Sequence, residues 1–209
     1  MKPSLLIAAA SIFTANASAL SALQAGCQPS WQPTFGGVSG PTNLVDAMTV
    51  FDDGSGPRLV AGDVAWDGFD WTMLGHVEGG QIFDLLALDD GGGTQLYAGG
   101  SFTITDDVQV AQIARWDGAS WSGLGGGLEG GVVNALAAFD DGGGPALIAA
   151  GGFTLADGNP ANRIAKWDGA SWSPLGSGLN GTVHALAAFD DGSGPALYAG
   201  GAFSTAGGV

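Results

Sequence analysis

The residues of this 209-residue chain with the most chemical capacity are its acids, which recur as pairs followed by glycine. The pairs are Asp52-Asp53, Asp89-Asp90, Asp140-Asp141 and Asp190-Asp191, and single acids before glycine stand at Asp67, Asp117 and Asp168. Such oxygens suit calcium, but they lack the alternating Asp spacing and the later bidentate Glu of a calcium loop. Asp beside Gly also accepts hydrogen bonds from backbone amides in tight turns. We therefore expect turn-forming acids and predict no metal site.

The chain offers little for acid–base or nucleophilic catalysis. Its two histidines, His76 and His184, lie in unrelated sequence contexts, and no nucleophile stands in a recognisable motif. Cys27 is the only cysteine, which excludes a disulfide within the chain. We predict no catalytic residue and no cofactor, and we expect a protein that is not an enzyme.

Charge and composition exclude several classes of protein. The chain has 20 acidic and 5 basic residues, for a formal net charge of −15. Phosphates would repel this surface, so a nucleic-acid partner is not expected. A hydrophobic fraction of 45%, with seven Trp and ten Phe, is too apolar for a disordered chain. The 39 glycines follow no every-third-residue rule, which excludes collagen.

The elements that carry these residues are copies of one unit of about 50 residues. The segment IARWDGASW at 113–121 returns as IAKWDGASW at 164–172, and a degraded copy lies at 64–71. The segment NALAAFDDGGGPAL at 134–147 returns as HALAAFDDGSGPAL at 184–197. Looser copies lie at 46–59 and 84–96.

One unit reads as four short strands with turns between them. In the best copy these are 133–139, 146–153, 163–167 and 171–175. The Asp-Gly loop after Trp167 places that residue opposite Trp172 as a cross-strand pair. No segment has a useful helical period. The sequence therefore predicts an all-β fold, a β-propeller of four-stranded antiparallel blades of about 50 residues each.

The repeated motifs also resemble a known family. The runs Phe-Asp-Asp-Gly-x-Gly-Pro-x-Leu, Ala-Gly-Gly-x-Phe-Thr and Ile-Ala-(Arg/Lys)-Trp-Asp-Gly-x-x-Trp are similar to the kelch-like propeller repeats of exported bacterial proteins. They are also similar to repeats in fungal cell-polarity surface markers. The resemblance covers residues 31–209 and implies a β-propeller outside the cytoplasm, in a family that usually has no assigned activity.

The N-terminal segment is typical of an export signal. Lys2 precedes an uncharged apolar run at 4–13, and small residues suited to signal peptidase follow. The run is too short to cross a bilayer, so we interpret 1–25 as a secretory signal peptide and expect no membrane span. We expect a secreted, periplasmic or cell-surface protein. The residues before Cys27 loosely resemble a lipoprotein box, so lipid attachment there is a minority alternative.

The repeats predict an incomplete propeller over 30–209. The expected parts are a donated closing strand at 30–36, a reduced blade at 43–78, full blades at 81–129 and 131–180, and a half blade at 181–209. Phe51 and Trp66 are 15 residues apart where Phe139 and Trp167 are 28 apart, so 13 residues are missing from the reduced blade. We expect its second and third strands to merge over 59–66. A fragment of a longer protein would expose apolar faces around 197 and 203.

Three other sets of residues occupy constant repeat positions, which predicts structural roles. The tryptophans fall into two positions, namely Trp66, Trp116 and Trp167 at one and Trp31, Trp71, Trp121 and Trp172 at the other. Tyr97 and Tyr198 share a position and are interpreted as packing residues. The pairs Gly99-Gly100, Gly151-Gly152 and Gly200-Gly201 predict close strand packing or a bulge.

The connections after each second strand differ between copies and are where we expect function. These loops are 103–112, 154–162 and the residues from 204 onward. They favour a non-enzymatic surface or extracellular interaction scaffold whose partner is an extracellular protein or a glycan. The alternatives are a fragment of a propeller enzyme, or a glycan-binding lectin, with its site in further blades.

Overall fold

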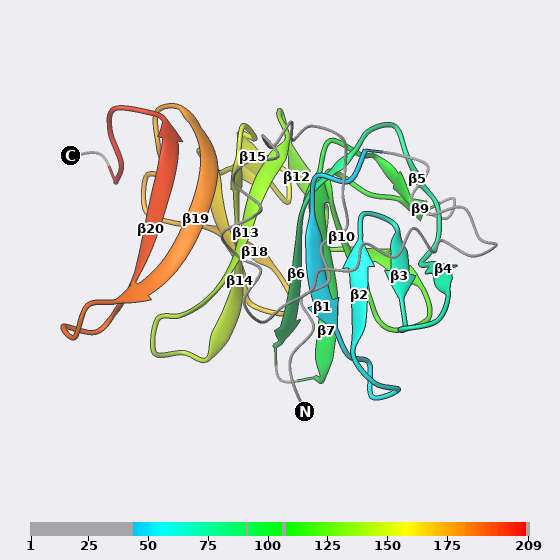
Figure 1. Ribbon diagram of the computed structural model, residues 1–209. Helices are drawn as coiled ribbons and strands as arrows, with labels where there is room; N and C mark the ends of the chain where they lie inside the picture. The colour runs from blue at the N-terminus through cyan, green and yellow to red at the C-terminus, as the bar shows by residue number, and fades with distance from the viewer. Residues whose placement is uncertain (1–43, 91, 106–107, 208–209) are drawn as a thin grey trace, which may run out of the picture.

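The computed structural model describes residues 44–90, 92–105 and 108–207 of the chain (Figure 1). These residues form antiparallel strands and turns, and none of them lies in a helix. The expected all-β class is therefore confirmed. The signal segment 1–25, Cys27, Trp31 and the closing strand expected at 30–36 lie outside the described residues.

The strands form four successive units. Unit 1 is a four-stranded sheet of β1 (Met48–Phe51), β2 (Arg58–Ala61), β3 (Val64–Trp66) and β4 (Trp71–Met73). Unit 2 is the sheet of β6 (Ile82–Asp89), β7 (Thr94–Gly100), β10 (Ile113–Trp116) and β11 (Trp121–Gly123). Unit 3 is the sheet of β13 (Val133–Asp140), β14 (Pro145–Gly151), β17 (Ile164–Trp167) and β18 (Trp172–Pro174). Unit 4 is the hairpin of β19 (Thr182–Asp190) and β20 (Pro195–Ala202).

The register of the strands follows from the turn residues. In unit 3, Trp167 pairs with Trp172 at the last hairpin, as the sequence predicts. At the first hairpin Asp140 pairs with Pro145, so both strands extend one residue further into the turn than expected. Each long first strand carries a register shift near its start, opposite the glycine at 100, 151 or 201. A Cβ at Gly151 would overlap the carbonyl oxygen of Val132. The interpretation of these glycines as sites of close strand approach is therefore confirmed.

Unit 1 differs from the expectation of a merged strand over 59–66. Strands β2 and β3 are separate, and a two-residue loop of Gly62 and Asp63 joins them. Gly62 has a φ of 61°, which glycine adopts without a steric penalty at the first position of such a loop. The prediction was wrong because the 13 missing residues belong to a connection outside the sheet, so a tight turn replaces them.

The connections expected to be loops contain small sheets instead. In unit 2, β8 (Ile104–Thr105) and β9 (Val108–Gln109) form a hairpin that pairs with β5 (Val77–Glu78). In unit 3, β15 (Leu155–Ala156) and β16 (Asn159–Pro160) pair with β12 (Leu128–Glu129). Each hairpin thus pairs with the linker that enters its own unit, and we call these two three-stranded sheets the edge sheets.

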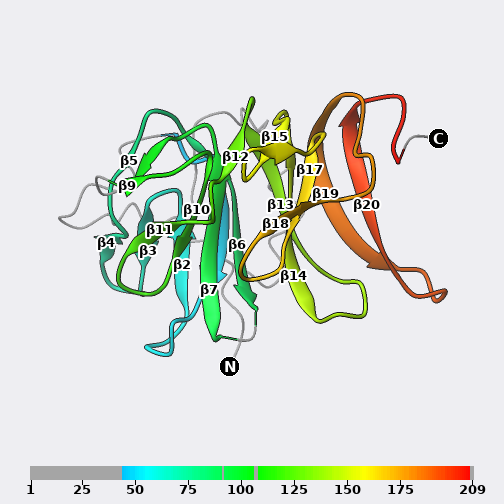
Figure 2. The ribbon, with the colours of Figure 1, turned by 180° about the vertical axis from the view of Figure 1, so that it is seen from behind.

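The units contact each other through their first strands. Strand β1 contacts β6, β6 contacts β13, and β13 contacts β19. Figures 1 and 2 show the sheets following one another across the molecule, from β3 and β4 at one end to β19 and β20 at the other. We call the side of each sheet toward the next unit its forward face, and the opposite side its rear face.

The core lies between these faces. The forward face of unit 2 presents Leu88, Tyr97 and Ile113, which cluster with residues of the rear face of unit 3, among them Leu136, Leu147, Trp167 and Trp172. The same arrangement joins units 1 and 2 and units 3 and 4. Burying each large apolar side chain stabilises the fold by roughly 1.5–3 kcal/mol. Packing between units is therefore the main source of stability in the described residues.

Within the described residues, the outer faces of units 1 and 4 are not packed against another unit. On the forward face of unit 4, Phe189 and Tyr198 are exposed, and on the rear face of unit 1, Met48 and Val50 are exposed. Exposure was expected around Leu197 and Phe203, but both are half-buried, because they belong to the rear side of unit 4 and pack against unit 3. Among the described residues, no sheet closes on itself.

Candidate functional site

The first acid of each Asp pair organises the first hairpin turn of its unit. Oδ1 of Asp140 accepts hydrogen bonds from the amides of Gly142 and Gly144, at 2.8 and 2.9 Å. Asp52 and Asp190 accept the equivalent bonds, between 2.8 and 3.1 Å. These acids act as the predicted turn formers.

The second acid of each pair binds a nearby side chain. Asp141 contacts Lys166 Nζ at 2.5 Å, and this hydrogen bond lowers the pKa of its carboxyl. Asp53 contacts Ser55 and Arg58, and the Ser55 hydroxyl is the main cause of its lowered pKa. Asp90 accepts a hydrogen bond of 2.8 Å from the Tyr97 hydroxyl.

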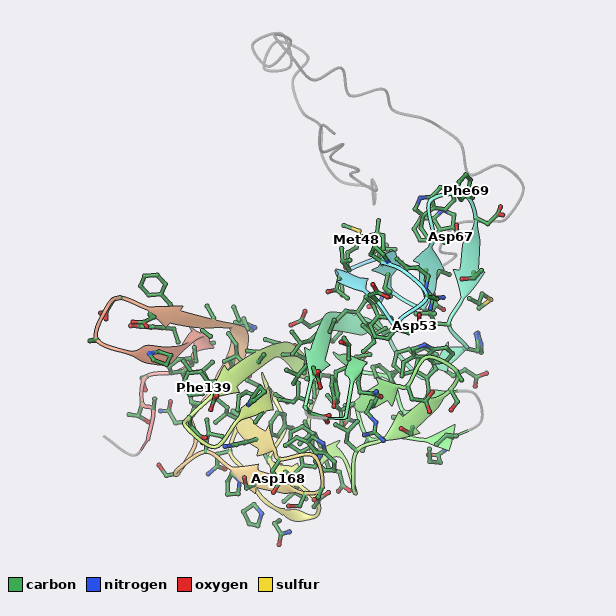
Figure 3. All side chains as sticks on the ribbon, turned by 90° about the horizontal axis from the view of Figure 1, so that it is seen from below. Met48, Asp53, Asp67, Phe69, Phe139 and Asp168 are labelled. Carbon is green, nitrogen blue, oxygen red and sulfur yellow. The ribbon has the colours of Figure 1, made fainter. Side chains whose placement is uncertain are left out.

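The acids of the Trp-Asp-Gly turns are equally engaged. Oδ1 of Asp117 accepts from the amides of Ala119 and Ser120, at 2.9 and 2.8 Å. Asp67 and Asp168 accept the equivalent backbone hydrogen bonds. Figure 3 labels both acids, which come from different units. These backbone hydrogen bonds lower the pKa of all three carboxyls. The eleven acids singled out in the sequence are thus distributed over separate turns.

Metal-ligating side chains do not gather in the part of the chain that the structure describes, where no three His, Cys, Asp or Glu residues could hold one ion. The two histidines are both on the surface. Nε2 of His76 lies 3.4 Å from Oε1 of Glu78, while His184 stands on β19 in unit 4. The described residues therefore present neither a histidine pair nor an acid cluster as a reaction centre.

The tryptophans pack as cross-strand pairs within the core. Ring centroids are 5.5 Å apart for Trp116 and Trp121 and 5.3 Å apart for Trp167 and Trp172, with tilted planes. All four side chains are buried. They cover the forward face of the preceding unit, so their expected structural role is confirmed and they form no stacking surface for a ligand.

The tyrosines behave differently although they share a repeat position. Tyr97 is completely buried, and burial raises the pKa of its hydroxyl well above the ordinary value. Its packing role is confirmed. Tyr198 is half exposed, because none of the other described units packs on this face of unit 4, and its ring centroid lies 6.3 Å from that of Phe189.

One residue ties the edge sheet of unit 3 to the core. Asp157 lies in the turn between β15 and β16 with a φ of 50°. Its Oδ1 accepts from the Gly126 amide at 2.6 Å, and its Oδ2 accepts from the Trp172 amide at 3.0 Å. The carboxylate therefore joins a linker, an edge turn and β18, which explains why an Asp tolerates this left-handed backbone.

The strongest candidate for a binding site is a hollow at the seam between units 3 and 4. It has a volume of about 320 Å³ and is widely open. It is lined by Asn162, Arg163, Ser177, Gly178, Leu179, Asn180 and Thr205. Amide, hydroxyl and guanidinium groups dominate this lining, which contains no carboxylate, imidazole or thiol. Its chemistry suits the binding of a polar ligand more than its conversion.

Asn180 fixes one wall of the hollow. Its Oδ1 accepts from the amides of Ser204 and Thr205 at 2.9 and 3.0 Å, and its Nδ2 donates to the Ser204 hydroxyl at 2.9 Å. On the other wall, Nδ2 of Asn162 donates to the Ser177 carbonyl at 3.0 Å. These bonds hold both walls in place, and they also explain the Asn-Gly-Thr sequence at 180–182 as a structural turn.

Arg163 supplies the only charge of the lining. It has a φ of 70°, and Gln112 and Gly62 adopt the same left-handed backbone at this repeat position. Nη1 of Arg163 donates to the Phe153 carbonyl at 3.2 Å. Its Nε is buried and has no hydrogen-bond partner among the described residues. Arg163 therefore combines a strained backbone with a guanidinium that is not fully hydrogen-bonded, in the lining of the hollow.

The hollow is much larger than the space at one corresponding seam. At the corresponding seam between units 1 and 2, around Gly62 and Val77, the space is only about 20 Å³. Sequence reasoning placed function on the connections after each second strand, and Asn162 and Thr205 come from two of them. The sequence analysis did not predict that the linker between units 3 and 4 contributes Ser177 and Asn180. The only feature that could have indicated this is the position of the linker directly before the first strand of unit 4.

Comparison with known proteins adds no relative: no protein-family model matches the chain, and no curated protein or solved structure is found to match it. Among the described residues there is also no helix of the length and apolar character needed to cross a membrane.

Proposed function

We propose that this chain is an exported, non-enzymatic binding scaffold. The observation that carries the proposal is the polar hollow of about 320 Å³ at the seam between units 3 and 4. In the described residues, the repeated aromatic side chains pack in the core and the repeated acids form turns. The connections that line the seam, in contrast, differ in sequence from copy to copy. Function on repeat folds resides in such variable connections.

The scaffold is proposed to be a β-propeller with units 1 to 3 as four-stranded blades. Support comes from the repeat of about 50 residues, the meander order of the strands, and the contacts between successive first strands, which in a propeller surround a common axis. An experimental structure of the protein tests this proposal. First strands arranged radially around one axis support it, and sheets stacked along a straight line contradict it.

The proposed partner is an extracellular protein or a glycan. The lining offers side-chain amides, hydroxyls and one guanidinium, which recognise hydroxyl-rich or anionic ligands through hydrogen bonds. This chemistry favours a lectin as the second candidate function. A glycan array screened with the protein tests it, with Arg163→Ala as the variant and Arg115→Ala, outside the hollow, as the matched control. Binding that Arg163→Ala abolishes and the control retains supports the site, and equal binding by both variants contradicts it.

Export is proposed from the segment 1–25 and is tested separately. The protein expressed with its own N-terminus should appear outside the cytoplasm, with a new N-terminus among the small residues near position 19 or beyond. Retention of Met1 in a cytoplasmic product would contradict export and would leave the binding proposal standing.

A further inference from the structure

The forward face of unit 4 has the composition of an interior surface. Tyr198 is 50% exposed, whereas the residues at its repeat position in units 1 to 3, Val60, Tyr97 and Ile148, are at most 1% exposed. Phe189 is 59% exposed, whereas Phe51 at its repeat position is 1% exposed. Tyr198 thus lies at a position that every earlier unit buries. Phe189 lies at a position that units 1 and 2 bury, at Phe51 and Leu88, and that unit 3 half-buries, at Phe139.

The rear face of unit 1 shows the same contrast. Met48 is 46% exposed, whereas Leu85 and Leu136 at its repeat position are 5% and 6% exposed. Val50 and Met73 are also exposed on this face. Figure 3 places Met48 at the outer side of unit 1, away from the neighbouring sheet. The array therefore ends in two apolar faces of different kinds.

The structure itself shows what covers a face of each kind. At three successive seams a forward face packs against the rear face of the following unit. Polar contacts between first strands accompany two of these seams. Oδ2 of Asp84 accepts from the Leu136 amide, and Nδ2 of Asn134 donates to the Val183 carbonyl, both at 2.7 Å. A forward face and a rear face thus form a matched pair.

We propose that the forward face of unit 4 docks on the rear face of unit 1 in a second copy of this chain, so that copies associate head to tail. The new contact continues the seam that recurs within the chain, with Phe189 and Tyr198 of one copy against Met48 and Val50 of the other. Because the two faces differ, the contact is heterologous, and repeated association gives a closed ring or an open filament.

Charge sets the salt dependence of this association. Every copy carries a formal net charge of −15, so two copies repel each other at low ionic strength. Salt screens this repulsion and leaves the apolar contact, so association is stronger at higher salt concentration. A contact held by ion pairs would respond in the opposite direction.

The test is sedimentation velocity of the full chain over a concentration series. The variants Tyr198→Asp and Met48→Asp each place a charge on one face, and Phe69→Asp is the control, because Phe69 is 85% exposed in the turn between β3 and β4. We expect the unmodified chain and Phe69→Asp to associate alike. Each face variant should weaken association by about tenfold or more.

Mixing the two face variants gives the decisive result. Met48→Asp retains an intact unit 4 face and Tyr198→Asp retains an intact unit 1 face, so their mixture should form a dimer and nothing larger. This recovery also shows that both variants are folded. The proposal is overturned by an unmodified chain that stays monomeric at all concentrations and salts, which would mean that the faces are covered within one chain. It is also overturned if Tyr198→Asp alone abolishes association while Met48→Asp has no effect, since that pattern means contact between identical faces.

Discussion

Trp121 and Trp172 share a repeat position, but their indole N–H groups differ. Nε1 of Trp172 donates to the Leu124 carbonyl at 3.0 Å, whereas the buried Nε1 of Trp121 has no hydrogen-bond partner in the described part of the chain. Both side chains are buried. Replacement by Phe removes a similar apolar area at each site, so the difference between Trp121→Phe and Trp172→Phe isolates the N–H group.

The magnitude of that difference follows from the two hydrogen-bonding states. Trp172→Phe loses one hydrogen bond, worth about 1 kcal/mol net, while the Leu124 carbonyl keeps its bond from the Gly127 amide. Trp121→Phe removes an unpaired buried donor, whose desolvation costs about 1–3 kcal/mol. We therefore expect Trp172→Phe to lower the free energy of unfolding by about 2–4 kcal/mol more than Trp121→Phe does. This corresponds to a Tm difference of at least about 4 °C for a chain of this size.

Urea denaturation followed by circular dichroism measures this difference. The protein should be diluted until it sediments as a monomer, so that association does not contribute to the apparent stability. The reasoning is refuted if the two Phe variants have equal midpoints, or if Trp121→Phe is the less stable of the two.

Three further predictions concern stability. Asp157→Ala removes two hydrogen bonds from a carboxylate and should lower the free energy of unfolding by about 2–4 kcal/mol in urea denaturation, and an unchanged midpoint would contradict its bridging role. In Gly62→Ala the added Cβ meets no atom within 4 Å, but the backbone φ is 61°, so the variant should lower the free energy of unfolding by about 1–2 kcal/mol through backbone strain alone. In Gly151→Ala the added Cβ overlaps the Val132 backbone, so the loss should be larger. Thermal denaturation compares the two variants, and a lower stability for Gly62→Ala would contradict the prediction. Backbone hydrogen bonds lower the pKa of Asp117 in the folded protein. The stabilisation by this carboxylate is therefore fully present above the ordinary pKa of 3.8 and is lost as the pH falls through the lowered pKa. The urea midpoint should fall less steeply below about pH 4 in Asp117→Asn than in the unmodified protein, and parallel curves would contradict this.

Much of the strand pattern could be predicted because each turn and pair has a local chemical cause. The Asp140 carboxylate forms its turn by accepting hydrogen bonds from the amides two and four residues later in the chain. Trp167 faces Trp172 across a four-residue loop. Such interactions depend on spacing alone, and a repeated sequence shows the same spacing several times. The roles of the turn acids and paired tryptophans were predictable for the same reason.

The edge sheets and the seam could not be predicted in this way. Strand β15 is only two residues long, and its partner β12 lies 26 residues earlier in the chain, so no local pattern indicates the pairing. The separation of β2 and β3 depends on one turn at Gly62, which the apolar run around it conceals. The hollow arises where residues from three connections meet, and its existence follows only from their packing.

Hydrogen exchange measured by mass spectrometry on the monomeric protein tests the central claim most directly, namely that successive units bury each other's faces. The account predicts slow exchange in β7 and β14, which lie between covered faces, and much faster exchange in β20, whose forward face is open. Equal protection of all three strands, or slow exchange in β20 with fast exchange in β14, would contradict it.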